Sequence, residues 1–195
     1  MPGLSDLTRR DVLARVAALI GALEAPVRVG IDGPDAAGKT TLADELAVVL
    51  AAAGRQVERL SADDFLRAPE HRHRRGRESP EGYYEDSFDH QRLRDTVLGS
   101  GSPLLVDGIF LQRPELDDLW TLRIFVSIGE NEVLRRGIQR DGAEMERLYR
   151  VRYLPGQRLY ADRVAPRDRA DVVVDNDDPD SPGLIMRRGE PGPAA

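Results

Sequence analysis

The segment GPDAAGKT, residues 33–40, restricts the fold of this chain more than any other stretch. It fits the pattern G-x-x-x-x-G-K-[ST], in which a glycine-rich loop surrounds phosphate groups at the start of a helix. β-Branched residues alternate before it at Val27, Val29 and Ile31 and predict a strand. The apolar residues behind it recur at helical spacing and are Leu42, Leu46, Val49 and Leu50. The strand–loop–helix context that the pattern requires is present, and we therefore expect a phosphate-binding loop.

The residues of this loop suit the phosphates of a nucleotide and a metal ion. Gly33 and Gly38 can adopt backbone angles closed to other residues, which lets successive N–H groups turn toward phosphate oxygens. Lys39 is the only lysine among 28 basic residues, and Thr40 offers a hydroxyl to Mg²⁺. We expect ATP and Mg²⁺ as cofactors. The expected nucleotide-binding residues are Gly33, Pro34, Asp35, Ala36, Ala37, Gly38, Lys39, Thr40 and Thr41.

Length and composition limit the kind of protein. The chain has 195 residues, 41% of them hydrophobic, which suits one domain; we expect it over 1–176, with a disordered tail over 177–195. No run approaches the roughly 18 apolar residues of a membrane span, and no signal peptide is recognisable, so we expect a cytoplasmic protein without membrane contact. Absence of cysteine excludes disulfides, and a net charge of −6 argues against general nucleic-acid binding. The oligomeric state stays open.

Periodicity predicts alternating helices and strands along the chain. We expect helices over 5–23 with Thr8 as N-cap, 89–98 with Asp89 as N-cap, 114–120, and 130–162 with a break at Pro155-Gly156. The expected strands after the phosphate-binding loop are 56–61, 104–108, 123–127 and 170–176, and residues 65–84 read as a loop. This alternation predicts an α/β fold with a mainly parallel sheet and helices on both faces.

Carboxylates follow two of the predicted strands. The carboxyl ends of parallel strands meet at one edge, so Asp63 and Asp107 should lie near Lys39. Asp107 suits a Walker B role that orients Mg²⁺, although an Asp can also merely begin a turn. A carboxylate such as Asp63 can accept the proton of an attacking hydroxyl, which favours phosphoryl transfer to an alcohol. Asp64 could exchange roles with Asp63.

Two arginine-rich segments remain. Arg136, Arg140 and Arg147 share one face if the helix over 130–162 is regular. They could form solvated surface pairs or a lid over the transferred phosphoryl group, and Arg136 and Arg140 are our candidates for catalysis. The basic segment 71–77 is either a solvated loop or an arm that reaches the acceptor.

Several motifs together resemble the uridine kinases and related P-loop nucleoside kinases, over residues 27–176. GPDAAGKTT is similar to the family's phosphate loop, SADDF (61–65) to its Asp-containing strand end, and VDGI (106–109) to its E-G-I segment with Asp in place of Glu. The resemblance implies that Asp63 is the catalytic base. It also implies that Asp89, in the F-D-H segment, contacts the sugar of the acceptor and that Arg140-Asp141 belongs to an arginine-rich lid.

The chain departs from this family at the acceptor side. Typical uridine kinases carry a pyrimidine-binding hairpin between the F-D-H and E-G-I segments, and residues 91–106 leave no room for one. Tyr83 and Tyr84 could replace its stacking role or could be packing residues, and the compact acceptor side also resembles nicotinamide riboside kinases. We expect a kinase for a nucleoside or a nucleoside-like alcohol. Pantothenate or a sugar phosphate is an alternative acceptor, and an ATP-binding regulatory protein without kinase activity is the alternative from another class.

Overall fold

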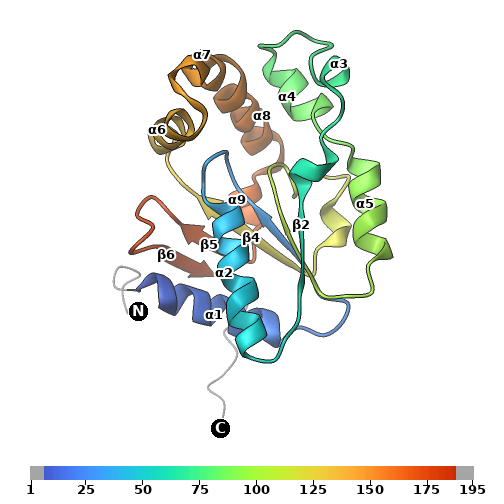
Figure 1. Cartoon of the computed structure of the whole chain (residues 1–195), viewed down its shortest axis with the longest axis vertical. Coiled ribbons are helices and arrows are strands. Elements are labelled where there is room, and N and C mark those ends of the chain that lie inside the picture. Colours follow the sequence, from blue (N-terminus) through green and yellow to red (C-terminus); the bar gives the residue numbers. More distant parts are fainter. Residues whose placement is uncertain (1–6, 188–195) are drawn as a thin grey trace.

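A computed structural model describes residues 7–187, and its centre is a six-stranded sheet (Figure 1). The strand order is β2-β3-β1-β4-β5-β6; the first five strands are parallel and β6 runs antiparallel to β5. The strands are β1 (Arg28–Asp32), β2 (Glu58–Ser61), β3 (Leu104–Asp107), β4 (Leu122–Ser127), β5 (Val172–Asp175) and β6 (Gly183–Met186). Because β1 lies between β3 and β4, the loop after it emerges at the middle of the sheet, where open α/β sheets bind ligands.

Helices cover both faces of this sheet, as the sequence predicts. The α-helices are α1 (Arg9–Gly21), α2 (Lys39–Ala52), α3 (Pro69–Arg72), α4 (Pro80–Asp86), α5 (His90–Gly99), α6 (Glu130–Asp141), α7 (Glu146–Leu148), α8 (Leu154–Val164) and α9 (Pro166–Arg169). Side chains alternate along each strand. Leu105 therefore joins the core beneath α1 and α2, whereas Leu104 and Val106 join a second core with α4, α5 and α8.

Local sequence signals explain several element boundaries. Thr8 caps α1 in a capping box with Asp11, and the Asp89 carboxylate accepts the Arg92 N–H at 3.1 Å at the start of α5. Gly30 in the central strand passes under the ring of Trp120; a Cβ there would lie 2.8 Å from the ring. The tight contact requires glycine at this position and fixes Trp120 in the core.

The prediction of a loop over 65–84 is wrong in part, because this segment contains α3 and most of α4. Ser79 caps α4 by accepting the Gly82 N–H at 2.9 Å, and Pro80 occupies the first turn, where its missing N–H costs nothing. A proline also begins α3. Conversely, the helix expected over 114–120 is only a 3-10 turn, η2 (Asp117–Leu119).

The helical segment after β4 breaks at another place than predicted. Its α6 ends at Asp141 and is followed by Gly142, which has φ of +102°, a conformation that glycine adopts readily. The chain continues through a 3-10 turn, η3 (Ala143–Met145), α7 and a π-helical stretch, η4 (Tyr149–Tyr153), and Pro155 falls in the first turn of α8. Arg147 therefore does not share a helix face with Arg136 and Arg140, and it pairs with Glu78 at 2.8 Å. In Figure 1, α6, α7 and α8 stand above the sheet beside α3 and α4.

The segment expected to be disordered contains strand β6. Leu184 pairs with Val174 and is buried, which extends the sheet beyond the predicted boundary at residue 176. Residues 188–195 of the expected tail lie outside the described part of the chain. Among residues 7–187, no helix has the length and apolar character needed to cross a membrane.

Candidate active site

The loop between β1 and α2 has the backbone geometry of a phosphate cradle. Gly38 has φ of +87°, and Gly33, at +151°, lies so close to β4 that a Cβ would be 2.3 Å from the Val126 carbonyl oxygen. Ala36 also has a positive φ, +56°, which alanine adopts only under constraint. The Lys39 ammonium donates to the Pro34 carbonyl at 2.6 Å, so the lysine folds back across its own loop. Both glycines occupy the backbone angles expected of them.

The residues expected to hold Mg²⁺ lie in contact. The Thr40 hydroxyl donates to the Asp107 carboxylate at 2.6 Å, although 67 positions separate them in the chain. The other Asp107 oxygen accepts from the Arg59 guanidinium at 2.6 Å, and Arg59 also pairs with Asp44 of α2. Mg²⁺ in phosphate sites takes one or two protein oxygens and fills its octahedron with phosphates and water, so this hydroxyl–carboxylate pair fits the ion. No local pattern in the sequence indicated Arg59.

Two cavities meet above this loop. The first, here called the phosphate cleft, measures about 530 Å³ and is lined by Ala36, Ala37, Gly38, Lys39, Thr40, Thr41, Arg136, Gln139 and Arg140. The second, here called the lid cavity, measures about 180 Å³ and lies between the loop, the η1 turn (Ala62–Phe65) and the helices after β4. Asp35, Asp63 and Arg140 line it. Arg140 therefore lines both cavities.

The two arginines chosen from the sequence differ in their contacts. The Arg140 guanidinium binds both oxygens of Asp141, at 2.7 and 3.0 Å, and donates to the Tyr149 hydroxyl at 3.2 Å. Arg136 donates to the backbone carbonyls of Asn176 and Asp177, both at 2.9 Å. Arg136 thus ties α6 to the end of β5, while Arg140 is held at the boundary between the cleft and the lid cavity.

Asp63 and Asp64, which the sequence leaves interchangeable, have different surroundings. Asp63 lines the lid cavity, whereas Asp64 lines neither cavity. Partial burial raises the pKa of Asp63, and the Lys39 ammonium opposes the shift. Burial lowers the pKa of Lys39, and the carboxylates of Asp35, Asp32 and Asp63 counteract it. The Asp63 carboxylate and the Lys39 ammonium therefore stabilise each other's charge.

The residues expected to bind an acceptor are only partly gathered at the lid cavity. Tyr83 lines it, and its hydroxyl donates to Asp35 at 2.5 Å; the same Asp35 oxygen accepts from the Gln157 amide at 2.6 Å. Tyr84 does not line it. Both rings lie 5.2 Å from the Phe110 centroid, but the Tyr84 ring faces the guanidinium groups of Arg113 and Arg163. Asp89 caps α5 and is also outside the lining, although its neighbour Phe88 belongs to it.

A buried carboxylate lies beneath the loop. Asp32, the last residue of β1, accepts the Gly33 N–H at 2.7 Å and the Gln112 N–H at 3.1 Å, and it also accepts from the Tyr160 hydroxyl of α8. Burial raises its pKa to about 6, and the hydrogen bonds from Tyr160 and Gly33 oppose the shift. This network connects the loop to α8. No local sequence pattern indicates Asp32, since its partners Gln112 and Tyr160 come from distant segments.

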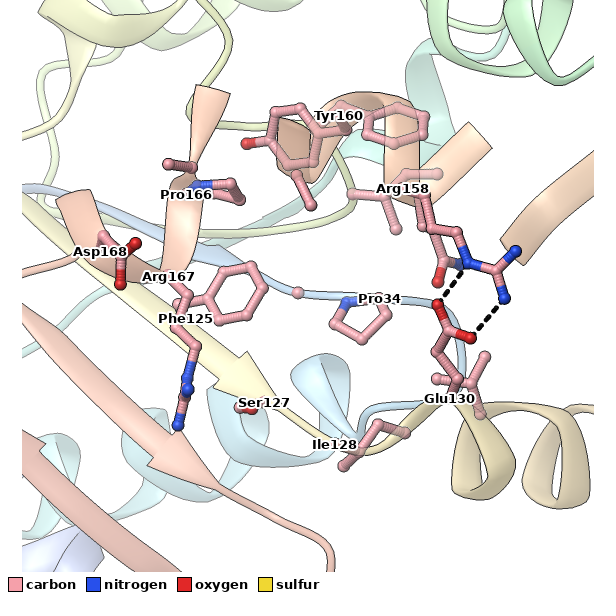
Figure 2. A pocket seen from close by; sticks show the side chains of 17 residues that line it. Pro34, Phe125, Ser127, Ile128, Glu130, Arg158, Tyr160, Pro166, Arg167 and Asp168 are labelled. Carbon is pink, nitrogen blue, oxygen red and sulfur yellow. Dashed lines mark hydrogen bonds and ion pairs between the residues drawn. The ribbon is translucent and has the colours of Figure 1, made fainter. Parts of the chain in front are cut away.

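A third cavity, of about 390 Å³, lies between β4, α8 and α9 (Figure 2). Phe125, Tyr160 and Pro166 line it, and it contacts the phosphate-binding loop at Gly33 and Pro34. The ion pair between Glu130 and Arg158 lies at its side, at 2.5 Å. Its mainly apolar lining distinguishes it from the phosphate cleft.

Comparison with solved structures supports the assignment of the fold. The chain is similar to a "possible uridine kinase" from Bacillus stearothermophilus, with a TM-score of 0.67 and 24% identity, over 84% of this chain and 97% of that one. It is also similar to a protein provisionally named a fructose transport system kinase from Silicibacter sp. TM1040, with a TM-score of 0.65, 18% identity and coverage of 80% and 95%. The chain has a P-loop kinase fold. A third similar structure, named YGR205w protein, has a TM-score of 0.60 and 12% identity over 93% of this chain and 99% of that one.

The P-loop kinase fold rests on structure and not on sequence relatives. No protein-family model matches the chain, and no curated protein matches it. The sequence-based resemblance to uridine kinase-like P-loop kinases thus agrees with the structural neighbours at the level of the fold.

Proposed function

We propose that this protein transfers the γ-phosphoryl group of ATP to a hydroxyl group of a small molecule, a nucleoside or a nucleoside-like alcohol. The observation that carries the proposal is the position of Arg140, which lines both the phosphate cleft and the lid cavity. Asp63 lies in the same lid cavity and Lys39 in the cleft. A phosphate held by the loop and a hydroxyl held beside Asp63 would therefore meet at one guanidinium.

In this mechanism Asp63 accepts the proton of the attacking hydroxyl. The acceptor oxygen forms a bond to the γ-phosphorus, the bond from that phosphorus to the β,γ-bridging oxygen breaks, and ADP leaves. Lys39 and Arg140 stabilise the negative charge on the transferred group. Thr40 and Asp107 would hold Mg²⁺, which neutralises phosphate charge when bound. Arg136 fixes α6 and is a supporting residue in this proposal.

In this proposal the acceptor is an alcohol, because an attacking hydroxyl must lose a proton and the Asp63 carboxylate can accept it. A phosphate acceptor is already ionised and needs no such base. The names of two structural neighbours mention uridine and fructose transport. Nicotinamide riboside, pantothenate and sugar phosphates are alternative acceptors, since each also carries a hydroxyl group.

The proposal is tested by measuring ADP formation from ATP with a panel of uridine, cytidine, nicotinamide riboside, pantothenate and pentose phosphates. We expect at least one acceptor to stimulate turnover in the wild type, and Lys39→Ala to abolish that stimulation. ATP binding without stimulation by any acceptor would instead favour a regulatory ATP-binding protein.

A further inference from the structure

The lid cavity contains charged groups that the proposed transfer does not use. Besides Asp35, Asp63 and Arg140, its lining includes Arg72 and Arg152. Arg72 is the last residue of α3 and belongs to the basic segment 71–77, whose sequence fits either a solvated loop or an arm to the acceptor. The three arginines of the cavity, Arg72, Arg140 and Arg152, differ in whether their guanidinium groups already have a partner.

Two of the three arginines already have a role. Arg140 pairs with Asp141 and Tyr149 and, in the proposed reaction, faces the transferred phosphoryl group. Arg152 is buried, and its guanidinium donates to the backbone carbonyls of Arg77 at 2.8 Å and Arg72 at 3.3 Å. Its guanidinium also lies 5.6 Å from the centroid of the Tyr83 ring. Arg152 thus fixes the backbone of the basic segment 71–77 against η4, and most of its guanidinium N–H groups are already used.

Arg72 is different, because its side chain makes no hydrogen bond or ion pair within residues 7–187. Its Nε is shielded from solvent and lacks a partner. Burying a guanidinium N–H without an acceptor is unfavourable. A rotation of the Arg72 side chain toward the cavity would give this N–H an acceptor, because the two oxygens of a carboxylate or phosphate match the donor geometry of a guanidinium. The structure therefore holds an unused anion-binding group facing the cavity that contains Asp63.

We propose that the acceptor carries an anionic group, a phosphate or a carboxylate, which Arg72 binds while the acceptor's hydroxyl lies beside Asp63. This inference rests on the proposed phosphoryl transfer to a hydroxyl group, and among the acceptors considered there it favours the anionic ones over a neutral nucleoside. The lid cavity, at about 180 Å³, is smaller than the roughly 300–1,000 Å³ of common ligand sites, which favours a compact acceptor such as a sugar phosphate or a sugar acid.

The surroundings of His73 support an anion site. His73 also lines the cavity, and its pKa is lowered by burial and by the positive charges of Arg152 and Arg72. A positive potential of this kind attracts an anion. The neutral imidazole that results can donate a hydrogen bond to the same ligand.

The test compares matched five-carbon probes: ribose and ribitol, which are neutral, with ribose 5-phosphate and ribonate, which are anionic. Binding is measured by titration calorimetry with wild type, Arg72→Gln and the control Arg77→Gln, and turnover is measured in parallel. The control removes the same charge from the same segment at an exposed side chain outside the lid cavity. The two anionic probes distinguish a phosphate from a carboxylate as the bound group.

We expect one of the anionic probes to bind at least about 10-fold more tightly than its neutral counterpart, corresponding to about 1.4 kcal/mol. Arg72→Gln should remove that difference and Arg77→Gln should leave it within about twofold. Equal affinity of the anionic and neutral probes, or equal effects of the two substitutions, would overturn the inference. Binding is read without turnover, so a protein that binds the anionic probe through Arg72 but phosphorylates nothing contradicts the proposed kinase and retains the anion site.

Discussion

Asp63 and Asp64 are neighbouring carboxylates, and only Asp63 lines the lid cavity. If Asp63 is the base, Asp63→Asn should lower kcat by about 10²- to 10⁴-fold, the usual contribution of general base catalysis, without changing the KM for ATP. Asp64→Asn is the matched control and should stay within about twofold of wild type. Steady-state kinetics of acceptor-dependent ADP formation measures both, and an equal loss in the two variants would contradict the role of Asp63.

The same residue predicts a pH dependence. The base must be ionised, and the pKa of Asp63 is raised above its ordinary value of 3.8 by partial burial. The value of kcat/KM should therefore fall as the pH decreases through this raised pKa. The control is the Asp63→Asn variant, whose residual activity should not show this acid limb, and a wild-type profile that stays flat down to pH 4 would exclude the ionisation.

Asp32 predicts a different pH effect, on stability. Its pKa in the folded protein is raised to about 6 from 3.8, so the folded state holds the proton more tightly than the unfolded state. The resulting stabilisation is complete below pH 3.8 and is lost as the pH rises through about 6. In Asp32→Asn this titration is absent.

The free energy of unfolding, measured by urea denaturation, should therefore decrease from pH 4 to pH 7 by up to about 3 kcal/mol more in wild type than in Asp32→Asn. Asparagine also presents an N–H₂ group to donors in the network, so the variant should be less stable than wild type at pH 4. A difference between the two proteins that does not vary with pH would show that Asp32 does not titrate in this range.

At the scale of elements, α6 and the π-helical stretch η4 pack so closely that only glycine fits at the α6 position that contacts η4. A Cβ on Gly137 would lie 2.3 Å from the Tyr149 ring. The Tyr149 hydroxyl donates to Asp141 at 2.7 Å, and Asp141 in turn holds Arg140. The packing of two helices thus determines the position of the arginine between the cleft and the lid cavity.

Gly137→Ala should displace Tyr149 and with it Arg140. We expect a loss of acceptor-dependent kcat on the order of 10- to 100-fold, since small misplacements of catalytic groups have effects of this size. We also expect a destabilisation of about 1–3 kcal/mol from overpacking. Gly99→Ala is the control, because this position in α5 has open space around it. Both variants are compared by thermal unfolding and by steady-state kinetics at a temperature at which both are folded. Unchanged kcat in Gly137→Ala would show that Arg140 does not depend on this packing.

At the scale of the whole molecule, the parallel sheet gathers the proposed site from four distant segments. Lys39 follows β1, Asp63 follows β2, Asp107 ends β3, and Arg140 belongs to α6, which follows β4. A nucleotide that binds the folded chain contacts groups that are dispersed in the unfolded chain, so binding must stabilise the fold.

MgATP at 100 times its Kd should stabilise the protein by about 2.7 kcal/mol, which corresponds to a rise in Tm of roughly 5–11 °C for a chain of this size. Differential scanning fluorimetry measures the shift. Lys39→Ala should show little of it, and ATP with EDTA should produce a smaller shift than MgATP. An equal shift in wild type and Lys39→Ala would indicate that ATP does not bind at the loop.

The sequence determines the features that depend on neighbouring residues. The strand–loop–helix unit around Gly33 and Gly38, the caps at Thr8 and Asp89 and the parallel α/β arrangement follow from periodicity and turn chemistry, and the structure agrees with each of them. The helix break expected at Pro155-Gly156 lies at Gly142 instead, because a proline in the first turn of a helix is tolerated and a glycine with positive φ ends the preceding helix.

Only the tertiary structure decides which distant side chains meet. Sequence spacing does not reveal that Arg59 binds Asp107 or that Asp63 and not Asp64 lines the lid cavity. Nor does it reveal that, of two neighbouring core tyrosines, Tyr83 lines this cavity and Tyr84 does not. These contacts depend on the register of neighbouring strands and on the direction of each side chain after a turn. The phosphate-binding loop is local and could be predicted, whereas the cavity beside it is assembled from segments whose relative positions only the complete packing fixes.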